Sequence, residues 1–211
     1  MKKEYVDIVI KGKFFPEYFL YVSKIAEGVE GTFVEAGFGK GLSANIFANI
    51  MESGFVTKRS MWLYDSFEGF PEPSPEDKSI KNVQKGEWKV PIEPALKVQD
   101  KIDRQVNVVK GYFEDTIPNS YTGGPIAILH LDCDLYSSYK VCLEGLYDKV
   151  APGGVILFDE YKSAKQLQFF PGASKAIDSF FKDIDIQMFR ANYDPSIYKS
   201  PKQKFFTIKP S

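Results

Sequence analysis

Apolar residues along the chain fall into short continuous runs that alternate with stretches of helical periodicity. The runs are rich in Val, Ile, Leu and Phe, as in strands buried on both faces, and several amphipathic stretches end at glycine. In chain order the pattern predicts a helix at 14–28, a strand at 31–38, a helix at 42–54, a strand at 60–67, a strand within 107–118, a strand at 125–136, a helix at 138–154, a strand at 155–161, a helix at 174–184, and strands at 184–191 and 204–210.

Strands that alternate with helices in this way indicate an α/β fold with a doubly wound, mostly parallel sheet that is covered by helices on both faces. In open sheets of this kind, ligands bind beyond the carboxyl ends of the strands. The residues that end each predicted strand are therefore the first candidates for a functional site, and they are unusually acidic.

Residues 71–97 do not fit the alternation, because they contain five prolines and many charges and show no clear periodicity. A stretch of this length without regular structure inside a compact domain is usually a functional lid or a disordered insertion. It directly follows the second predicted strand, so we expect a lid at the ligand-binding edge of the sheet.

Composition adds limits on the class of protein. A chain of 211 residues with 44% hydrophobic and 26% charged residues is expected to form a single globular domain over 1–211. The 27 Lys and Arg residues nearly balance the 28 Asp and Glu residues, which gives no support for a nucleic-acid partner.

No run approaches the ~18 apolar residues of a membrane helix. Asp7, Lys11 and Lys13 interrupt the first apolar residues before the core of a signal peptide could form. Cys133 and Cys142 lie in segments predicted to be buried. We therefore expect a reduced, cytoplasmic protein without a membrane partner.

The first predicted strand runs into a glycine turn with the spacing Glu35-x-Gly37-x-Gly39-x-Gly41. This spacing differs from the Gly-x-Gly-x-x-Gly of dinucleotide sites, and the turn lacks the Gly-Lys-Ser/Thr ending of a phosphate-binding loop. Glycines let the backbone take positive φ and approach a ligand closely. A tight strand-to-helix connection without a ligand is the other explanation for the turn.

Asp65 strengthens the ligand interpretation, because it ends the next strand, where a carboxylate can accept hydrogen bonds from both hydroxyls of a ribose. A solvated cap or surface acid is the other explanation for Asp65. Glu35 lies where a dinucleotide fold would bring a pyrophosphate nearby, so an acid there favours a cofactor with a cationic amino-acid end. S-adenosylmethionine satisfies both expectations.

Four carboxylates end the fourth and fifth predicted strands, Asp132 with Asp134 and Asp159 with Glu160. These strands should be neighbours, so the four groups should crowd one end of the sheet. Burying unpaired anions together is strongly unfavourable, and a divalent cation would relieve the repulsion. A site built from oxygen ligands favours Mg²⁺ or Ca²⁺ over Zn²⁺.

His130 and Cys133 are not expected among the ligands. A lone histidine within a strand is more often a packed core residue, and alternation turns Cys133 from the face that Asp132 and Asp134 share. A bound metal would acidify a coordinated hydroxyl, and Asp134, if it is not a ligand, would be placed to take the proton. Asp134 could instead cap a helix that begins near Ser137.

Five separated blocks between about residues 31 and 181 carry a family resemblance: FVEAGFGKG, LYDSFEGFPEP, GYFEDTIP, LHLDCDLYSSYKVCLEGLYDKVAPGGVILFDEY and PGASKAIDSFF. In this order they resemble the macrocin O-methyltransferase family. The resemblance implies a seven-stranded class I methyltransferase fold, S-adenosylmethionine as methyl donor, and Mg²⁺-dependent transfer to a sugar hydroxyl.

Carried over by position, the resemblance implies cofactor contacts at Glu35, Gly37, Phe38, Gly39, Gly41, Ser43, Asp65, Ser66, Phe67, Gly111, Glu114, Asp115 and Asp132. It implies metal ligands at Asp132, Asp159 and Glu160, and a catalytic role for Asp132 with Asp134 as the general base. The chain has Cys133 where the family commonly has glycine and Glu160 where it commonly has aspartate. The resemblance also implies that the chain is short at the N-terminus, where relatives carry helices that contribute to the acceptor pocket and to oligomer contacts.

The sequence therefore predicts a metal-dependent O-methyltransferase for a sugar or other polyhydroxylated small molecule, with a homodimer as the assembly to test. Two alternatives stay open, a catechol-type O-methyltransferase and a catalytically inactive cofactor-binding partner protein. The intact set of strand-end acids argues against the inactive protein, because a degenerate site has no reason to keep so costly a cluster.

Overall fold

The computed structural model describes residues 16–162, 164–190 and 203–210 of the 211-residue chain. Residues 14, 15 and 191, at the ends of two predicted elements, lie outside the described residues. The strands are β1 (Thr32–Ala36), β2 (Met61–Asp65), β3 (Val106–Lys110), β4 (Ile126–Leu131), β5 (Val150–Phe158), β6 (Gln187–Arg190) and β7 (Gln203–Ile208). The α-helices are α2 (Pro16–Ile25), α3 (Leu42–Glu52), α4 (Glu93–Leu96), α5 (Phe113–Ser120), α6 (Tyr136–Leu146), α7 (Ala164–Phe169) and α8 (Pro171–Phe180), with short 3₁₀ helices η1 (Pro75–Asp77), η2 (Lys97–Lys101) and η3 (Tyr147–Lys149).

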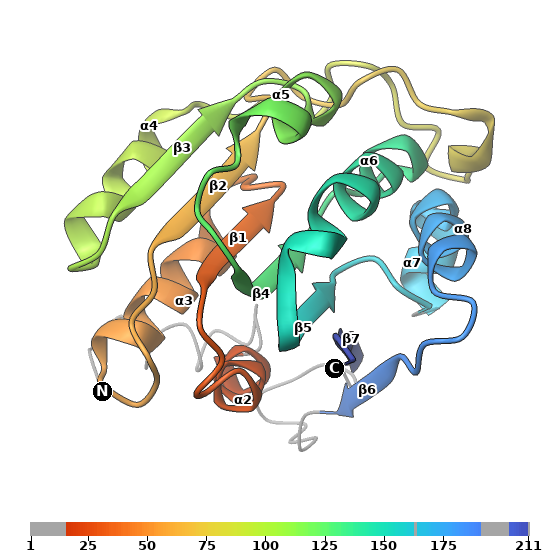
Figure 1. Cartoon of the computed structure of the whole chain (residues 1–211). Helices are drawn as coiled ribbons and strands as arrows, with labels where there is room; N and C mark the ends of the chain where they lie inside the picture. The colour runs from red at the N-terminus through yellow and green to blue at the C-terminus, as the bar shows by residue number, and fades with distance from the viewer. Residues whose placement is uncertain (1–15, 163, 191–202, 211) are drawn as a thin grey trace, which may run out of the picture.

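The seven strands form one sheet in the order β3-β2-β1-β4-β5-β7-β6 (Figure 1). The pairs β3–β2, β2–β1, β1–β4 and β4–β5 are parallel, whereas β7 is antiparallel to both β5 and β6. This arrangement confirms the predicted doubly wound, mostly parallel sheet. The order of strands reverses between β1 and β4, which is where the connections diverge and leave a crevice at the carboxyl ends.

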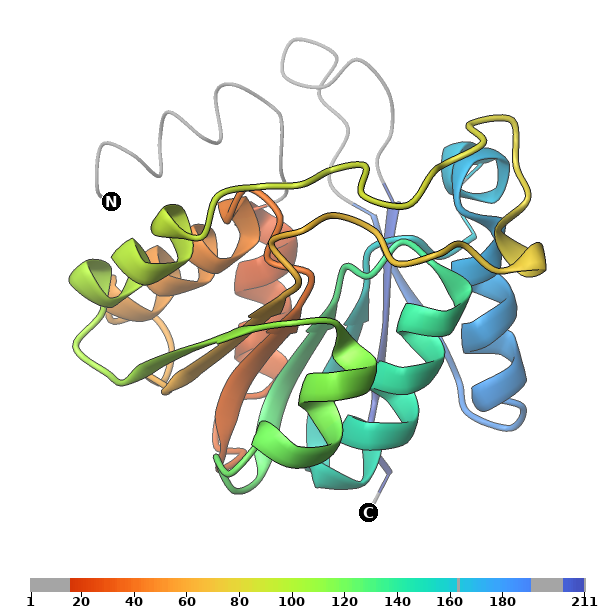
Figure 2. The ribbon, with the colours of Figure 1, turned by 90° about the horizontal axis from the view of Figure 1, so that it is seen from above.

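Helices cover both faces of the sheet, as the view from above shows (Figure 2). Successive strand residues point to opposite faces. Phe33 accordingly belongs to an apolar core shared with α2 and α3, and its neighbour Val34 belongs to the core shared with α5, α6 and α8. Each of the described helices falls short of the length and apolarity that a membrane span requires.

The fifth strand begins earlier than the sequence pattern predicts. The pattern extends a helix to Gly154, but α6 ends at Leu146 and β5 begins at Val150. Val150 pairs with Ile126 of β4, and the Gly154 carbonyl accepts a 2.8 Å hydrogen bond from the Lys209 amide. Pairing on both sides therefore outweighs the proline and glycines that signal a break. The short helix α7 has no counterpart among the predicted elements.

The predicted lid segment, 71–97, leaves the end of β2 and extends along the carboxyl edge of the sheet to α6 and α8 (Figures 1 and 2). Its base is closed by two hydrogen bonds, from the Phe70 amide to the Glu87 carbonyl and from the Gly86 amide to the Phe70 carbonyl, each 2.9 Å. Its far end is held by the buried Asp77, whose Oδ1 accepts a 2.7 Å hydrogen bond from the Tyr136 amide at the start of α6.

Candidate active site

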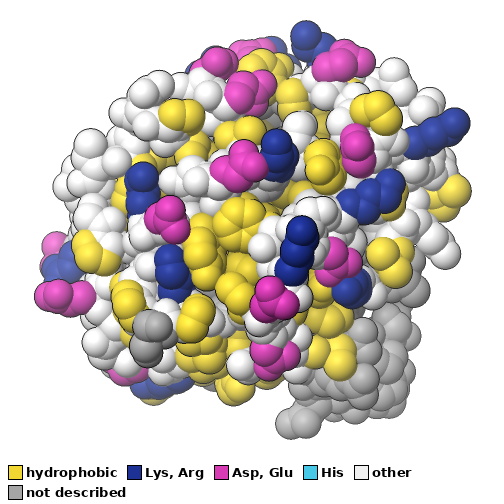
Figure 3. Space-filling view, turned by 45° about the vertical axis from the view of Figure 1, so that its right-hand side comes forward, with side chains coloured by type: hydrophobic (Ala, Val, Ile, Leu, Met, Phe, Trp, Pro, Cys, Tyr) yellow, Lys and Arg dark blue, Asp and Glu magenta, His cyan; other side chains and the backbone are white. Residues whose placement is uncertain are grey.

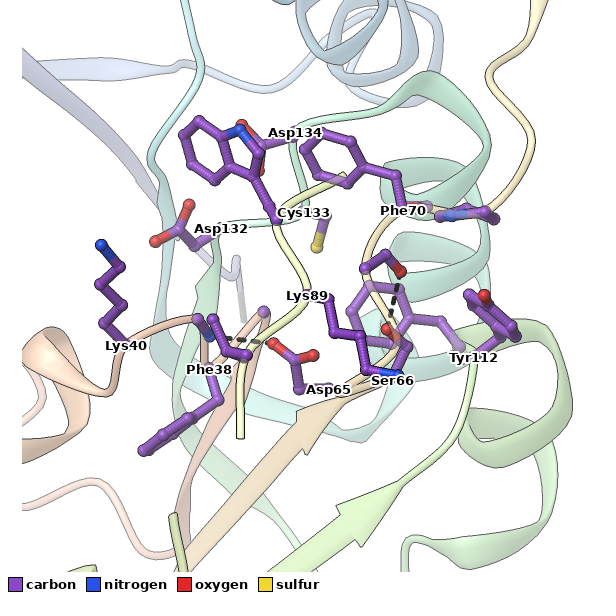
Figure 4. A pocket seen from close by; sticks show the side chains of 18 of the residues that line it. Phe38, Lys40, Asp65, Ser66, Phe70, Lys89, Tyr112, Asp132, Cys133 and Asp134 are labelled. Carbon is purple, nitrogen blue, oxygen red and sulfur yellow. Dashed lines mark hydrogen bonds between the residues drawn. The ribbon is translucent and has the colours of Figure 1, made fainter. Parts of the chain in front are cut away.

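A cavity of about 690 Å³ opens at the carboxyl ends of β1, β2 and β4. Figure 4 shows Asp65 and Ser66 at the end of β2, Lys40 in the glycine turn, and Asp132 and Asp134 after β4. Residues of the segment 69–71 and of 88–90 complete its lining. One cavity thus joins the glycine turn to two of the strand-end acids.

The glycine turn is shaped by its contact with β4. Gly37 has φ 93°, and a Cβ built on it would lie 1.8 Å from the carbonyl oxygen of Asp132. Gly39 also has positive φ, 53°, but a Cβ there would meet no atom within 4 Å. The turn is therefore pressed against Asp132 at Gly37 and has free space beside Gly39.

Asp65 links the turn to the end of β2. Its Oδ2 accepts a 2.9 Å hydrogen bond from the Gly39 amide, and its Oδ1 accepts a 2.7 Å bond from the Phe67 amide. Burial raises the pKa of Asp65, and these backbone donors oppose the rise. A carboxylate oxygen has two acceptor positions, so Asp65 keeps capacity for a ligand in the cavity that it lines.

Glu35 and His130 form a fully buried pair beneath the turn. They are partners in the β1–β4 register, and Glu35 Oε1 lies 2.9 Å from His130 Nδ1. Burial raises the pKa of Glu35. For His130, burial lowers the pKa, but the hydrogen bond and charge of Glu35 outweigh it and the net pKa is raised. His130 packs against Phe19, with ring centroids 5.6 Å apart, so it is the core residue that the sequence predicts.

Three of the predicted acids come together after β4 and β5. Asp132, Asp159 and Glu160 each offer an oxygen within 4.8 Å of the others. Glu160 Oε2 accepts hydrogen bonds from the Tyr139 hydroxyl at 2.8 Å and from the Asp134 amide at 3.2 Å. The donor set consists of hard oxygen ligands and fits a divalent cation such as Mg²⁺.

The charges of these acids are strongly coupled. Burial and the neighbouring Asp159 raise the pKa of Asp132 to about 7. Burial together with the surrounding carboxylates also raises the pKa values of Asp134 and Glu160. Burial would raise the pKa of Asp159 too, but the Lys204 ammonium holds it below its usual range.

Lys204 is the residue of this cluster that sequence reasoning missed. Its Nζ donates a hydrogen bond to Asp159 Oδ1 and forms an ion pair with it. The predicted strand at 204–210 did contain this lysine, but its antiparallel pairing with β5 could not be read from the local pattern. The Lys204 ammonium thus offsets part of the repulsion among the acids.

Asp134 does not act as the cap of α6. That helix has Leu135 at its N-cap position without a side-chain hydrogen bond, and Asp77 from the predicted lid binds the Tyr136 amide. Asp134 has φ 58°, an uncommon conformation for a residue other than glycine, and it lines the cavity. A left-handed backbone conformation in a cavity-lining residue such as Asp134 points to a functional position.

Cys133 turns away from the acids, as alternation predicts. Its Sγ lies 3.4 Å from the Ala36 carbonyl oxygen and 3.7 Å from the Sγ of Cys142 on α6. Both cysteines are free thiols and both are buried. Burial raises the pKa of the Cys133 thiol well above its usual value, so the neutral thiol fills the space beside β1.

The structure places the predicted site residues in two groups. Those that line the cavity are Gly37, Phe38, Gly39, Ser43, Asp65, Ser66, Glu114, Asp132 and Asp134. Those outside its lining are Glu35, Gly41, Phe67, Gly111, Asp115, Asp159 and Glu160. Of the second group, Gly111 joins the ends of β2 and β3 through a 3.0 Å hydrogen bond from its amide to the Asp65 carbonyl.

The predicted lid contributes lining residues that the sequence did not single out, among them Trp88 and Lys89. Trp88 has 58% of its surface exposed and φ 62°, and its ring stacks on Phe70 at a centroid distance of 5.8 Å. Phe170, between α7 and α8, meets the edge of Trp88 at 6.2 Å. Lys81 Nζ lies 3.9 Å from the centre of the Trp88 ring. The sequence signal for this lining role is a tryptophan within a segment rich in prolines and charged residues.

The surface around the predicted lid and α8 carries charges of both signs. In Figure 3, lysines and arginines alternate with acids over this face, and hydrophobic side chains lie between them. This mixture agrees with the nearly balanced composition of the chain.

Comparison with known proteins identifies relatives over most of the chain. The family model Macrocin-O-methyltransferase (TylF) matches residues 21–190. The 8-demethyl-8-(2,3-dimethoxy-alpha-L-rhamnosyl)-tetracenomycin-C 4'-O-methyltransferase of Streptomyces olivaceus is 33% identical over 145 residues, which are 65% of this chain and 55% of that protein. The mycinamicin III 3''-O-methyltransferase of Micromonospora griseorubida is 30% identical over 150 residues, 66% of this chain and 58% of that one. The chain thus spans little more than half the length of these two relatives.

Solved structures confirm the fold. The crystal structure of CalS11, a calicheamicin methyltransferase, superimposes with a TM-score of 0.74 and 18% sequence identity, covering 92% of this chain and 77% of CalS11. The two chains therefore share a fold.

We expect Gly37→Ala to lower the free energy of unfolding by about 3 kcal/mol or more, because the new methyl group would overlap the Asp132 carbonyl and the residue would keep positive φ. Gly39→Ala, the matched control, meets no atom and should cost only about 1–2 kcal/mol for its backbone conformation. Urea denaturation of both variants measures the difference. Equal losses for the two variants would show that the turn does not press on β4.

Proposed function

Because the chain belongs to the macrocin O-methyltransferase family, we propose that it transfers a methyl group from S-adenosylmethionine to a hydroxyl of a sugar or other polyhydroxylated small molecule, with a divalent cation at the site. The observation that carries the proposal is the single cavity that joins the turn and Asp65 to Asp132 and Asp134. A methyl donor held by the turn and Asp65 would face a hydroxyl held near Asp132 and Asp134.

The residues on the turn side fit the cofactor. The space beside Gly39 lets a ligand approach the backbone, and Asp65 has acceptor capacity for the two ribose hydroxyls. Ser66 and Glu114 line the neighbouring wall, where the adenine would lie. Glu35 is fully buried beneath the turn, and its contact with the cationic end of the cofactor stays a prediction. When bound, the cofactor supplies a methyl group on a positively charged sulfur.

The residues after β4 and β5 fit a divalent cation and a proton acceptor. Asp132, Asp159 and Glu160 would hold the cation, which when bound supplies Lewis acidity that lowers the pKa of an acceptor hydroxyl. Asp134 lines the same cavity, and its raised pKa makes its carboxylate a better proton acceptor than an ordinary aspartate. We assign Asp134 as the general base.

Trp88 of the predicted lid and Phe70, which directly precedes the lid, would form the acceptor side. Trp88 and Phe70 line the cavity, and Lys81, which lies over Trp88, also lowers the pKa of Asp134 by its charge. Trp88 and the proposed base line the same cavity. A sugar ring can stack its C–H face on an indole, which agrees with the sugar-modifying relatives. An aromatic wall would also suit a phenol, so a catechol is the second candidate acceptor.

S-adenosylhomocysteine should bind the protein with a micromolar dissociation constant. Asp65→Asn should weaken this binding at least about tenfold, because the charge and one of the two carboxylate oxygens that accept from the ribose are lost. Isothermal titration calorimetry measures both. Asp100→Asn is the matched control, because it makes the same substitution at an exposed residue outside the cavity lining. If Asp100→Asn weakens binding as much as Asp65→Asn does, Asp65 is not the ribose acceptor.

Methyl transfer from labelled S-adenosylmethionine should occur to sugars or glycosides within a panel of hydroxylated acceptors, and chelation of divalent cations should abolish it. Asp132→Asn should lower the rate of transfer, and added divalent cation should no longer change that rate. Asp134→Asn should lower kcat by roughly 10²–10⁴ and leave S-adenosylhomocysteine binding unchanged. Transfer to catechols alone would favour the second acceptor class. Cofactor binding without transfer to any acceptor would favour the inactive partner protein.

With the acceptor found in that panel, Trp88→Ala should raise the acceptor KM about tenfold, because a stacking surface is removed. Trp88→Phe should stay within about threefold of the parent KM. Phe55→Ala is the control, because Phe55 is 56% exposed and lies outside the cavity lining. A change in the dissociation constant of S-adenosylhomocysteine, with the acceptor KM unaltered, would instead place Trp88 at the adenine.

A further inference from the structure

Lys204 occupies a defined position beside the acid cluster. The antiparallel register pairs Phe158 of β5 with Phe205 of β7. Asp159 follows Phe158 and Lys204 precedes Phe205, so these two residues face one another. Lys204 Nζ donates to Asp159 Oδ1 and lies 3.5 Å from the Asp159 carbonyl oxygen. Only 18% of the Lys204 side chain and 24% of the Asp159 side chain are exposed. The ion pair is therefore held by the sheet and is largely shielded from water.

Lys204 adds a positive charge to the acid cluster. Asp132, Asp159 and Glu160 are close enough to share one cation, and Lys204 already places a positive charge on one of them. A partly buried charge pair is screened much less than a pair in water. An incoming divalent cation would therefore meet a resident positive charge and would compete with it for the Asp159 carboxylate.

We propose that Lys204 is a built-in counter-ion of the acid cluster, which stabilises the cluster without metal and weakens its affinity for a divalent cation. The inference rests on the proposed function, since it concerns the same cation site. It makes the C-terminal strand β7 part of that site, and it explains how three close acids coexist when no metal is bound. Lys204 is a positioning residue, because it acts through Asp159.

The test uses Lys204→Met, which keeps an apolar side chain of similar length and removes the charge. Mn²⁺ binding to the whole chain, without cofactor, is measured by the loss of the free-ion electron paramagnetic resonance signal. Removal of the charge should tighten Mn²⁺ binding about tenfold. In chelator, Lys204→Met should melt several degrees below the parent protein, and Mn²⁺ should raise its melting temperature by more than it raises that of the parent.

Two further variants serve as controls. Lys209→Met removes the same charge just beyond the opposite end of β7, where Lys209 Nζ donates a 2.8 Å hydrogen bond to the Tyr147 carbonyl, and it should leave Mn²⁺ affinity within twofold of the parent. Lys204→Arg keeps the charge and should also stay near the parent affinity. Far-ultraviolet circular dichroism in Mn²⁺ checks that each variant is folded, and Lys204→Gln replaces Lys204→Met if that variant is not.

The outcomes separate this inference from the proposed function. Equal Mn²⁺ affinity of the parent and the charge-removing variant overturns the counter-ion role and leaves the metal in the proposed function. Binding by the variant alone supports the counter-ion role and removes the metal from the function of the parent protein. Absence of Mn²⁺ binding by both proteins overturns the counter-ion role and also removes the metal from the proposed function.

Discussion

The parallel pairing of β1 with β4 is the constraint on which the site depends. It brings the glycine turn after β1 against the first residue after β4, so that Gly37 and the Asp132 carbonyl leave no room for a side chain between them. The same register sets Glu35 opposite His130 and buries their hydrogen bond under the turn. The glycine turn and the acids after β4, which line the two sides of the cavity, therefore meet at one close contact.

Much of this could be predicted because the signals are local. Apolar runs, the glycines and the acids at strand ends lie next to one another in the sequence, and the open parallel sheet dictates that strand ends meet. The prediction failed where partners are distant. Lys204 reaches Asp159 only through the antiparallel pairing of β7 with β5, and Asp77 caps α6 from 59 residues away. Neither contact produces a periodic pattern in the sequence. The segment 71–97 also has no periodicity from which the place of Trp88 could be deduced.

The acid cluster shows how the fold gives different surroundings to acids that look alike in the sequence. The sequence predicts that four strand-end carboxylates crowd one end of the sheet, and three of them, Asp132, Asp159 and Glu160, do lie within 4.8 Å of one another. Asp159 stays ionised beside a lysine, Asp132 and Glu160 have raised pKa values, and Asp134 stands apart with its amide donated to Glu160. What the three clustered acids share is proximity, and proximity is what a cation with several oxygen ligands needs.

The segment between β2 and α4 is fastened at two places, where its base closes on itself and where Asp77 grips α6. Movement of the whole segment away from the cavity would break these hydrogen bonds. While they hold, residues 69–71 and 88–90 form a frame that lines the cavity. Substitutions in that frame could change which molecules enter the cavity while the arrangement of charge at the strand ends stays as it is, so that selectivity and reactivity are separable in this fold.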